Sequence, residues 1–261
     1  IGVLINLNEQ VKSQLLPEGF RDGLPDLAEL EFQINSFFVN LMISNGFLMV
    51  KPPLVEFEDS LFFLTKYSEN IDSFRVMDPL TQKTMGIRTD ITMQVARIAC
   101  GSLVENKRPL RLCYTGDVLK VKNNNINLSR QFTQIGAEII GVDKTFCLSE
   151  IINLIIEFLN NLKIKKFIIN FSMPNLINLI SKDFNLKKSD FEILMNCYKN
   201  KNLSALKDIS NDLFEMSEYL LQCIGNIDEK INLLKKYKFP KNIKSEIDNF
   251  ISQIKKIKEE F

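Results

Sequence analysis

Apolar positions recur along the chain with two periods, one typical of helices and one typical of strands. Between residues 26 and 45 they fall on one helical stripe, at spacings of three and four: Leu27, Leu30, Ile34, Phe37, Phe38, Leu41 and Met42. Residues 47–51 follow as a short strand, and the two prolines after it confine that strand to a sheet edge or a terminus. A long helix followed by an edge strand is therefore the first predicted unit.

Two alternating runs, at residues 110–121 and 132–139, flank a turn signal of clustered asparagines at residues 123–125. Because successive side chains of a strand point to opposite faces, Gln134 and Glu138 share a face of the second run. An amide and a carboxylate on one face, beside a glycine, suit the floor of a ligand pocket. The same alternation fits an ordinary antiparallel strand with one solvated face, which is the simpler interpretation on periodicity alone.

Residues 74–77 and 84–88 are predicted to be two further strands joined by a turn. An apolar-periodic helix begins at Asp90, whose carboxylate would either cap the helix by accepting backbone N–H groups or line a ligand site. Its two oxygens allow both roles. A helix over residues 144–162 and an apolar strand at residues 166–171 follow.

Beyond residue 173 the pattern is helical throughout. Predicted helices follow one another at residues 174–181, 189–200, 203–209, 212–223, 227–237 and 240–261. The last helix carries isoleucines on one face and lysines mixed with carboxylates on the other, which is typical of a solvated helix face rather than a nucleic-acid patch. The sequence therefore divides into residues 1–172, which contain the strands, and an all-helical segment at residues 173–261.

The composition narrows the possible chemistry. Hydrophobic residues make up 45% and charged residues 25% of the 261-residue chain, as in soluble globular proteins, and the net charge of +1 gives no overall field for nucleic acid. There is no histidine, which excludes histidine-based acid–base catalysis and histidine metal ligands. We therefore expect no metal site and no cofactor.

The cysteines and the apolar runs bear on location. The five cysteines form no CxxC pair and suit reduced thiols. No apolar run approaches the ~20 residues that span a bilayer, and the apolar first residues lack the basic leader of a signal peptide. We expect a cytoplasmic protein that does not contact a membrane.

A long signature reads RPLRLCYTGDVLK from residue 108 and RQFTQIGAEIIG from residue 130. It resembles motif two of class II aminoacyl-tRNA synthetases in its histidyl-tRNA synthetase form. It is more similar still to the regulatory subunits of ATP phosphoribosyltransferase, which are paralogues of that synthetase. The LPEGFRD stretch at residues 16–22 resembles the opening of the same family, and residues 26–53 have the layout of motif one, which builds a dimer interface there.

The resemblance implies an α+β fold: a class II synthetase-like core with an antiparallel sheet flanked by helices, here residues 1–172, and then the helical C-terminal segment. It is strong over residues 15–171 and fades afterwards, and no stretch like the family's GGRYDGL histidine motif follows.

The resemblance also implies a histidine site at four residues. Asp90 and Thr92 match the Glu-Gly-Thr that holds the amino group of histidine in the synthetases, with the carboxylate one methylene shorter. Gln134 and Glu138 match the amide and the carboxylate of the second strand of motif two. All four residue types that hold the amino acid are therefore retained or closely replaced.

The nucleotide site is degraded by the same alignment. Lys120 takes the place of the arginine that grips the α-phosphate of ATP, and Lys122 takes the place of a glutamate, while Arg130 is retained. Lysine lacks the planar fork that holds a phosphate bidentately, and asparagines at residues 123–127 replace the usual charged loop.

The implied function follows from this contrast. A protein that keeps the amino-acid floor and loses the phosphate grip suits a histidine sensor without catalytic residues of its own. The resemblance implies a homodimer within a hetero-oligomer, whose partner is the short-form catalytic subunit of ATP phosphoribosyltransferase. No tRNA partner is expected. The alternatives are the catalytic core of a histidyl-tRNA synthetase and a binding module that retains only the dimer scaffold.

Overall fold

The computed structural model describes residues 16–61, 72–122, 129–142 and 144–259. Contacts divide the chain into two compact units, Ile1–Lys165 and Lys166–Phe261, whereas the sequence interpretation places the division after residue 172. Each unit is described by itself below. The predicted asparagine turn at residues 123–125 lies outside the described residues.

The first unit is built on a long antiparallel strand pair, β5 (Leu110–Leu119) and β6 (Gln131–Ile140). The two strands pair along their full length, so that Leu110 lies opposite Ile140 and Leu119 lies opposite Gln131. The two-residue strand β1 (Leu48–Met49) adds in parallel to β5 and gives the sheet order β1-β5-β6. The predicted edge strand and both alternating runs are thus confirmed as strands of one sheet.

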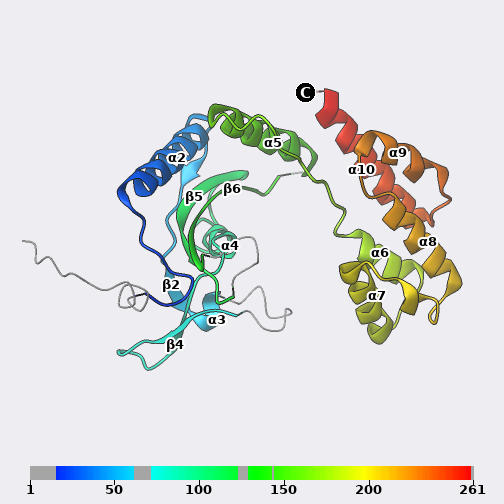
Figure 1. Ribbon diagram of the computed structural model, residues 1–261, viewed down its shortest axis with the longest axis horizontal. Helices are drawn as coiled ribbons and strands as arrows, with labels where there is room; N and C mark the ends of the chain where they lie inside the picture. Colours follow the sequence, from blue (N-terminus) through cyan, green and yellow to red (C-terminus); the bar gives the residue numbers. More distant parts are fainter. Residues whose placement is uncertain (1–15, 62–71, 123–128, 143, 260–261) are drawn as a thin grey trace, which may run out of the picture. The chain divides into compact units, whose positions relative to one another are not determined.

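Helices pack on both faces of this sheet, as Figure 1 shows for α2 (Pro25–Ser44), α5 (Lys144–Asn161) and α4 (Thr92–Cys100). On one face, α2 and α5 bury apolar side chains against β5 and the odd-numbered residues of β6. That cluster is Phe38, Leu41, Met42, Phe47, Cys113 and Leu154, with Ile135, Ala137 and Ile139 beside it. The other face packs on α4, through Ile91, Val95, Ala99, Leu112 and Tyr114. The even-numbered side chains of β6 therefore face α4.

A second, smaller antiparallel sheet has the order β2-β4-β3. Its strands are β2 (Val55–Phe57), β3 (Arg75–Met77) and β4 (Thr84–Ile87), and the short helix α3 (Glu58–Leu61) follows β2. The two predicted strands are confirmed as β3 and β4. The sequence did not predict β2, because three residues after a proline pair are too few to show a period.

A buried guanidinium ties the small sheet to the large one. Arg88 follows β4 and is only 6% exposed. Its Nε donates to the carbonyl of Asp117 in β5 at 2.7 Å, and one Nη donates to the carbonyl of Pro52 at 2.9 Å. The arm runs over Gly116, where any added Cβ would collide with it. This clamp fixes the chain that leads into Asp90 and α4.

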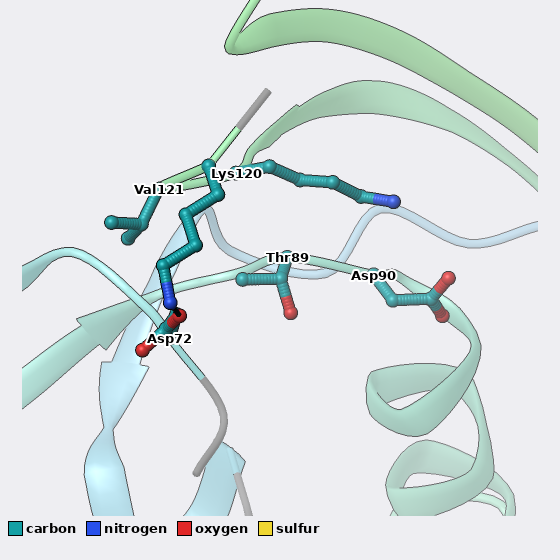
Figure 2. Close-up of a pocket in the computed structure, with 6 residues that line it drawn as sticks. Asp72, Thr89, Asp90, Lys120 and Val121 are labelled. Atoms are coloured by element: carbon teal, nitrogen blue, oxygen red, sulfur yellow. Dashed lines mark ion pairs between the residues drawn. The ribbon is translucent and has the colours of Figure 1, made fainter. Parts of the chain in front are cut away.

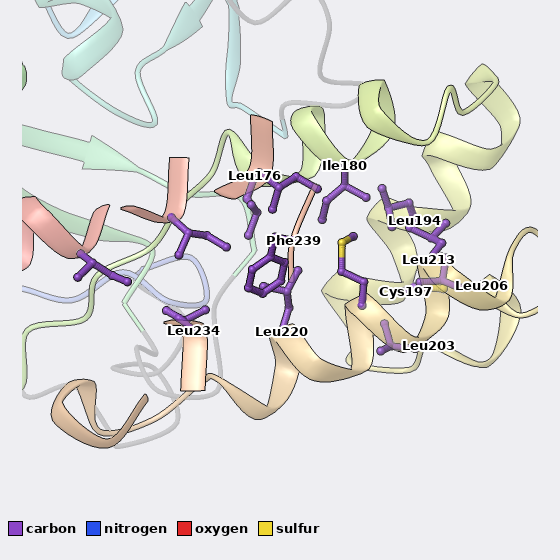
Figure 3. Packing of buried hydrophobic residues seen from close by; sticks show 14 of the residues in the cluster. Leu176, Ile180, Leu194, Cys197, Leu203, Leu206, Leu213, Leu220, Leu234 and Phe239 are labelled. Carbon is purple, nitrogen blue, oxygen red and sulfur yellow. The ribbon is translucent and has the colours of Figure 1, made fainter. Parts of the chain in front are cut away.

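The second unit is a helical bundle with its own core, shown in Figure 3. Its helices are α6 (Leu176–Asp183), α7 (Lys188–Asn200), the 3-10 helix η2 (Ser204–Leu206), α8 (Asn211–Gln222), α9 (Ile227–Lys236) and α10 (Lys241–Glu259). The isoleucine face predicted for the last helix is buried in this core, through Ile243, Ile247, Ile251 and Ile254.

Two predictions for this region are wrong. Residues 166–171 form no strand, and Ile168 is 84% exposed. A strand requires a neighbouring edge with which its backbone can pair, and no ladder within the described residues includes this segment. The predicted helix at residues 203–209 is only the single 3-10 turn Ser204–Leu206. The chain turns there because the Ser210 hydroxyl accepts the backbone N–H of Leu213 and starts α8.

Candidate functional site

The predicted ligand residues meet where α4 begins against β6. The Asp90 carboxylate accepts the backbone N–H of Thr92 at 2.7 Å through one oxygen and the Gln134 amide at 2.9 Å through the other. The Gln134 carbonyl oxygen in turn accepts the backbone N–H of Ile91 at 2.9 Å. Asp90 thus binds the first turn of the helix as predicted, although the capping position itself is Ile91.

Glu138 joins this cluster through a residue that sequence reasoning missed. The Tyr114 hydroxyl lies 3.1 Å from the Thr92 hydroxyl and donates to Glu138 Oε1 at 3.4 Å. Tyr114 comes from β5 and pairs in register with Gly136. Only the strand register, which no local pattern reveals, places Tyr114 between Gln134 and Glu138. The structure therefore brings all four predicted residues together around one tyrosine.

Burial sets the electrostatics of the cluster. It raises the pKa of Glu138 above its usual value of 4.5, while hydrogen bonds from Thr92 and Tyr114 lower that pKa and the Asp90 charge raises it. Burial also raises the pKa of Tyr114 to about 12, so its hydroxyl stays protonated at physiological pH. Neither Asp90 nor Glu138 forms an ion pair within the described part of the chain. Two carboxylates without a paired cation suit a ligand that carries an amine or another positive group.

A hollow of about 320 Å³ opens beside Asp90, shown in Figure 2. Its lining consists of Asp72, Thr89, Asp90, Lys120, Val121 and Lys122. Lys122 forms an ion pair of 2.5 Å with Asp72. The Lys120 side chain extends along the hollow toward the side of Asp90, and its amine lies 5.5 Å from the centre of the Phe132 ring. Both predicted lysines thus line one hollow with the predicted ligand carboxylate.

Arg130 is engaged elsewhere and is not among the residues that line the hollow. Its guanidinium lies 5.3 Å from the ring centre of Phe20 and 4.6 Å from that of Phe74. One Nη donates to the carbonyl of Glu18 at 3.1 Å, and the backbone N–H donates to Gly19 at 2.7 Å. Arg130 therefore fastens the turn of residues 17–20 to the start of β6.

Two further features are absent from the described ranges. No group of three or more carboxylates and cysteines there is arranged to hold a metal ion. Within the same residues, no helix combines the length and the apolar character that a membrane span requires.

The comparisons with known proteins agree on one family. Residues 19–260 match the family model described as histidyl-tRNA synthetase. The chain is 32% identical over 243 residues to the ATP phosphoribosyltransferase regulatory subunit of Rhodospirillum rubrum, which covers 93% of this chain and 63% of that protein. It is 40% identical over 171 residues to the protein of the same name from Paramagnetospirillum magneticum, which covers 66% of this chain and 45% of that protein. The chain thus spans roughly half to two-thirds of the length of these relatives.

A solved structure supports the fold independently. The crystal structure described as an ATP phosphoribosyltransferase regulatory subunit/histidyl-tRNA synthetase from Bacillus halodurans C superposes with a TM-score of 0.76. It covers 94% of this chain and 64% of that one at 21% identity. The α+β fold of the class II synthetase type, expected from the sequence, is thereby confirmed.

Proposed function

The chain belongs to the histidyl-tRNA synthetase family, and from this premise we propose that it is a non-catalytic regulatory subunit of an ATP phosphoribosyltransferase. In this role it binds the catalytic subunit, activates it and couples its activity to histidine, at the first step of histidine biosynthesis. The names of the two relatives support the assignment, because both proteins are described as regulatory subunits rather than as synthetases.

One structural contrast carries the proposal. The residues matched to amino-acid binding are assembled in one hydrogen-bonded cluster, whereas two of the three residues matched to nucleotide binding are committed to other contacts. Lys122 is paired with Asp72, and Arg130 is held between two phenylalanine rings. Catalysis of adenylation requires charged groups preorganised around the transferring phosphate. A sensor requires only that its ligand bind two states of the assembly differently.

The alternative, a synthetase core, has less support from this arrangement. A lysine at position 120 offers a point charge where a synthetase uses a bidentate fork. A lysine at position 122 offers no acceptor for the nucleotide and brings a charge of the opposite sign. Histidine-dependent exchange of pyrophosphate into ATP measures this activity directly, and we expect none.

The regulatory role is tested by reconstitution. The purified chain is mixed with the short-form catalytic subunit, and both co-elution and the rate of phosphoribosyl transfer are measured with and without histidine. We expect a joint peak and a higher rate than that of the catalytic subunit alone. An unchanged rate together with separate elution would remove the proposal.

Histidine binding is tested separately by calorimetry on the chain alone. Glu138→Gln removes the charge of a half-buried carboxylate that has no paired cation among the described residues and should weaken binding by ~1–3 kcal/mol, or about 5- to 150-fold in Kd. The matched control is Glu157→Gln, which removes an exposed carboxylate from α5 on the opposite side of the sheet. Equal affinity in the two variants would demote Glu138 to a support of the sheet.

The proposed homodimer is supported by the exposed half of α2. The carboxyl-terminal part of its apolar stripe is buried, but Leu27 is 43% and Leu30 is 52% exposed. Apolar side chains gathered on one helix are suited to covering by a second copy. Leu30→Glu should lower the mass measured by light scattering, whereas Asn40→Glu, which adds the same charge at an exposed polar position of α2, should not. Identical masses for both variants would count against this face.

A further inference from the structure

The cluster depends on a residue that none of the site predictions included. Tyr114 is 3% exposed, and its ring lies over Gly136 on the neighbouring strand. An added Cβ at Gly136 would come within 2.5 Å of the Tyr114 Cζ atom. Since Gly136 stands between Gln134 and Glu138 on the same strand face, the missing side chain creates the space through which the tyrosine reaches both α4 and Glu138.

The hydroxyl at the end of this ring has two neighbours and one proton. It lies 3.1 Å from the Thr92 hydroxyl and 3.4 Å from Glu138 Oε1. An ionised carboxylate only accepts, so Tyr114 donates to Glu138, and the single hydroxyl proton of Thr92 is shared between Glu138 and the Tyr114 oxygen. This leaves the lone pairs of Thr92 and the second oxygen of Glu138 as acceptors. Both acceptors suit the N–H groups of a ligand amine.

Protonation of Glu138 reverses the chain of hydrogen bonds. The carboxylic acid then donates to the Tyr114 oxygen, and Tyr114 donates to Thr92, whose own hydroxyl proton turns outward. The site then presents donors where it had presented acceptors, and it loses its negative charge at Glu138. The ionisable groups that act on Glu138 are Asp90, on the turn before α4, and Tyr114 itself, on β5.

We propose that Tyr114 is the positioning residue of this site, and that its hydroxyl holds the Glu138 carboxylate and the Thr92 hydroxyl in the arrangement that accepts a ligand amine. The inference rests on the proposed function for the identity of the ligand, which is an amino acid in its ammonium form. The geometric claim concerns only the three side chains and is measurable without a ligand.

The test is Tyr114→Phe, which keeps the ring over Gly136 and deletes the hydroxyl. In the ligand-free protein, the Glu138 carboxyl carbon is followed by NMR as the pH is varied. We expect its titration midpoint to move to higher pH, because the ionised form loses a donor. Thr92→Val should move it in the same direction. The control is Tyr198→Phe, which deletes a buried hydroxyl in the helical unit and should leave the Glu138 titration unchanged.

Histidine binding supplies the second readout. In Tyr114→Phe we expect Kd at neutral pH to rise roughly 2- to 10-fold, the equivalent of one ordinary hydrogen bond, and the decline of affinity toward acid pH to begin at a higher pH. A merely structural role would lower the unfolding midpoint without moving either pH profile. An unshifted Glu138 titration would overturn the proposal. A shifted titration in a protein that binds no histidine would support the positioning role and count instead against the proposed ligand.

Discussion

The contact between Tyr114 and Gly136 yields the sharpest stability prediction. Gly136→Ala places a methyl group where the structure has the tyrosine ring, with the Tyr114 Cζ atom 2.5 Å and the Cε2 atom 2.9 Å away. Cβ atoms do not approach other atoms so closely. The ring is buried between the sheet and α4 and cannot move aside without disturbing its neighbours. The substitution must therefore displace the ring from the cluster.

The expected cost follows from two opposing contributions. Inserting a methyl group into a packed site typically costs 1–3 kcal/mol, so about 2 kcal/mol is a fair central value. Replacing glycine by alanine also restricts the unfolded chain, which returns about 0.4–1 kcal/mol. The net loss of unfolding free energy should be about 1–2 kcal/mol, measured by urea denaturation. Histidine affinity should fall in the same variant, since the hydroxyl leaves Glu138.

A matched glycine provides the control. Gly23→Ala adds a Cβ whose nearest neighbour is the Ala28 methyl group at an ordinary distance of 3.8 Å. It should leave stability unchanged or slightly higher. In a Tyr114→Leu background, which removes the crowded ring atoms, the cost of Gly136→Ala should shrink markedly. Equal costs in both backgrounds would refute the packing argument, as would a Gly136→Ala protein as stable as the parent.

Three further predictions concern groups with unusual environments. Arg88→Met should cost ~2–3 kcal/mol of unfolding free energy, because two buried carbonyls lose a charged donor; a loss below ~0.5 kcal/mol in urea denaturation would contradict the clamp. The folded-state pKa of Glu138 is raised, so its contribution to stability is present at acid pH and is lost as pH rises through that pKa. Glu138→Gln should therefore gain stability relative to the parent between pH 4 and pH 7. A difference in unfolding free energy between variant and parent that stays constant over this range would refute the argument. Arg130→Met should release the turn of residues 17–20, seen as faster tryptic cleavage at Arg21 than in the parent; an unchanged cleavage rate would indicate that the turn is held by other contacts.

The local pattern of apolar and polar residues was enough to predict those elements in which the pattern extends over many residues. The alternation on either side of the asparagine cluster predicted both long strands, and the shared face of Gln134 and Glu138 follows from the strand period alone. The strand predicted at residues 166–171 is wrong, because composition cannot tell whether another strand offers an edge with which this segment can pair. Strand pairing is a property of two segments, and only one of them is visible in a local pattern.

The site shows the same division between local and non-local information. Asp90 at a helix start and Glu138 on a strand face were identified from their own neighbours in sequence. The role of Tyr114 depends on register, since it is Gly136 across the strand pair that leaves room for the ring. The ion pair of Lys122 with Asp72 joins residues fifty positions apart, and no spacing rule connects them. Contacts between two segments that are distant in the sequence can be identified only from the structure.

The cluster also shows why its members should differ in what they contribute. Asp90 and Gln134 bond to each other and to the first backbone groups of α4, so their polar atoms already stabilise the junction of helix and sheet. Glu138 accepts hydrogen bonds from Thr92 and, at a long 3.4 Å, from Tyr114, and it is half-buried with no paired cation among the described residues. A cationic ligand therefore gains most from Glu138, whose charge costs free energy until the ligand neutralises it. Asp90 and Gln134 maintain the geometry of the site, and Glu138 is the group whose electrostatic free energy changes most when a cationic ligand binds.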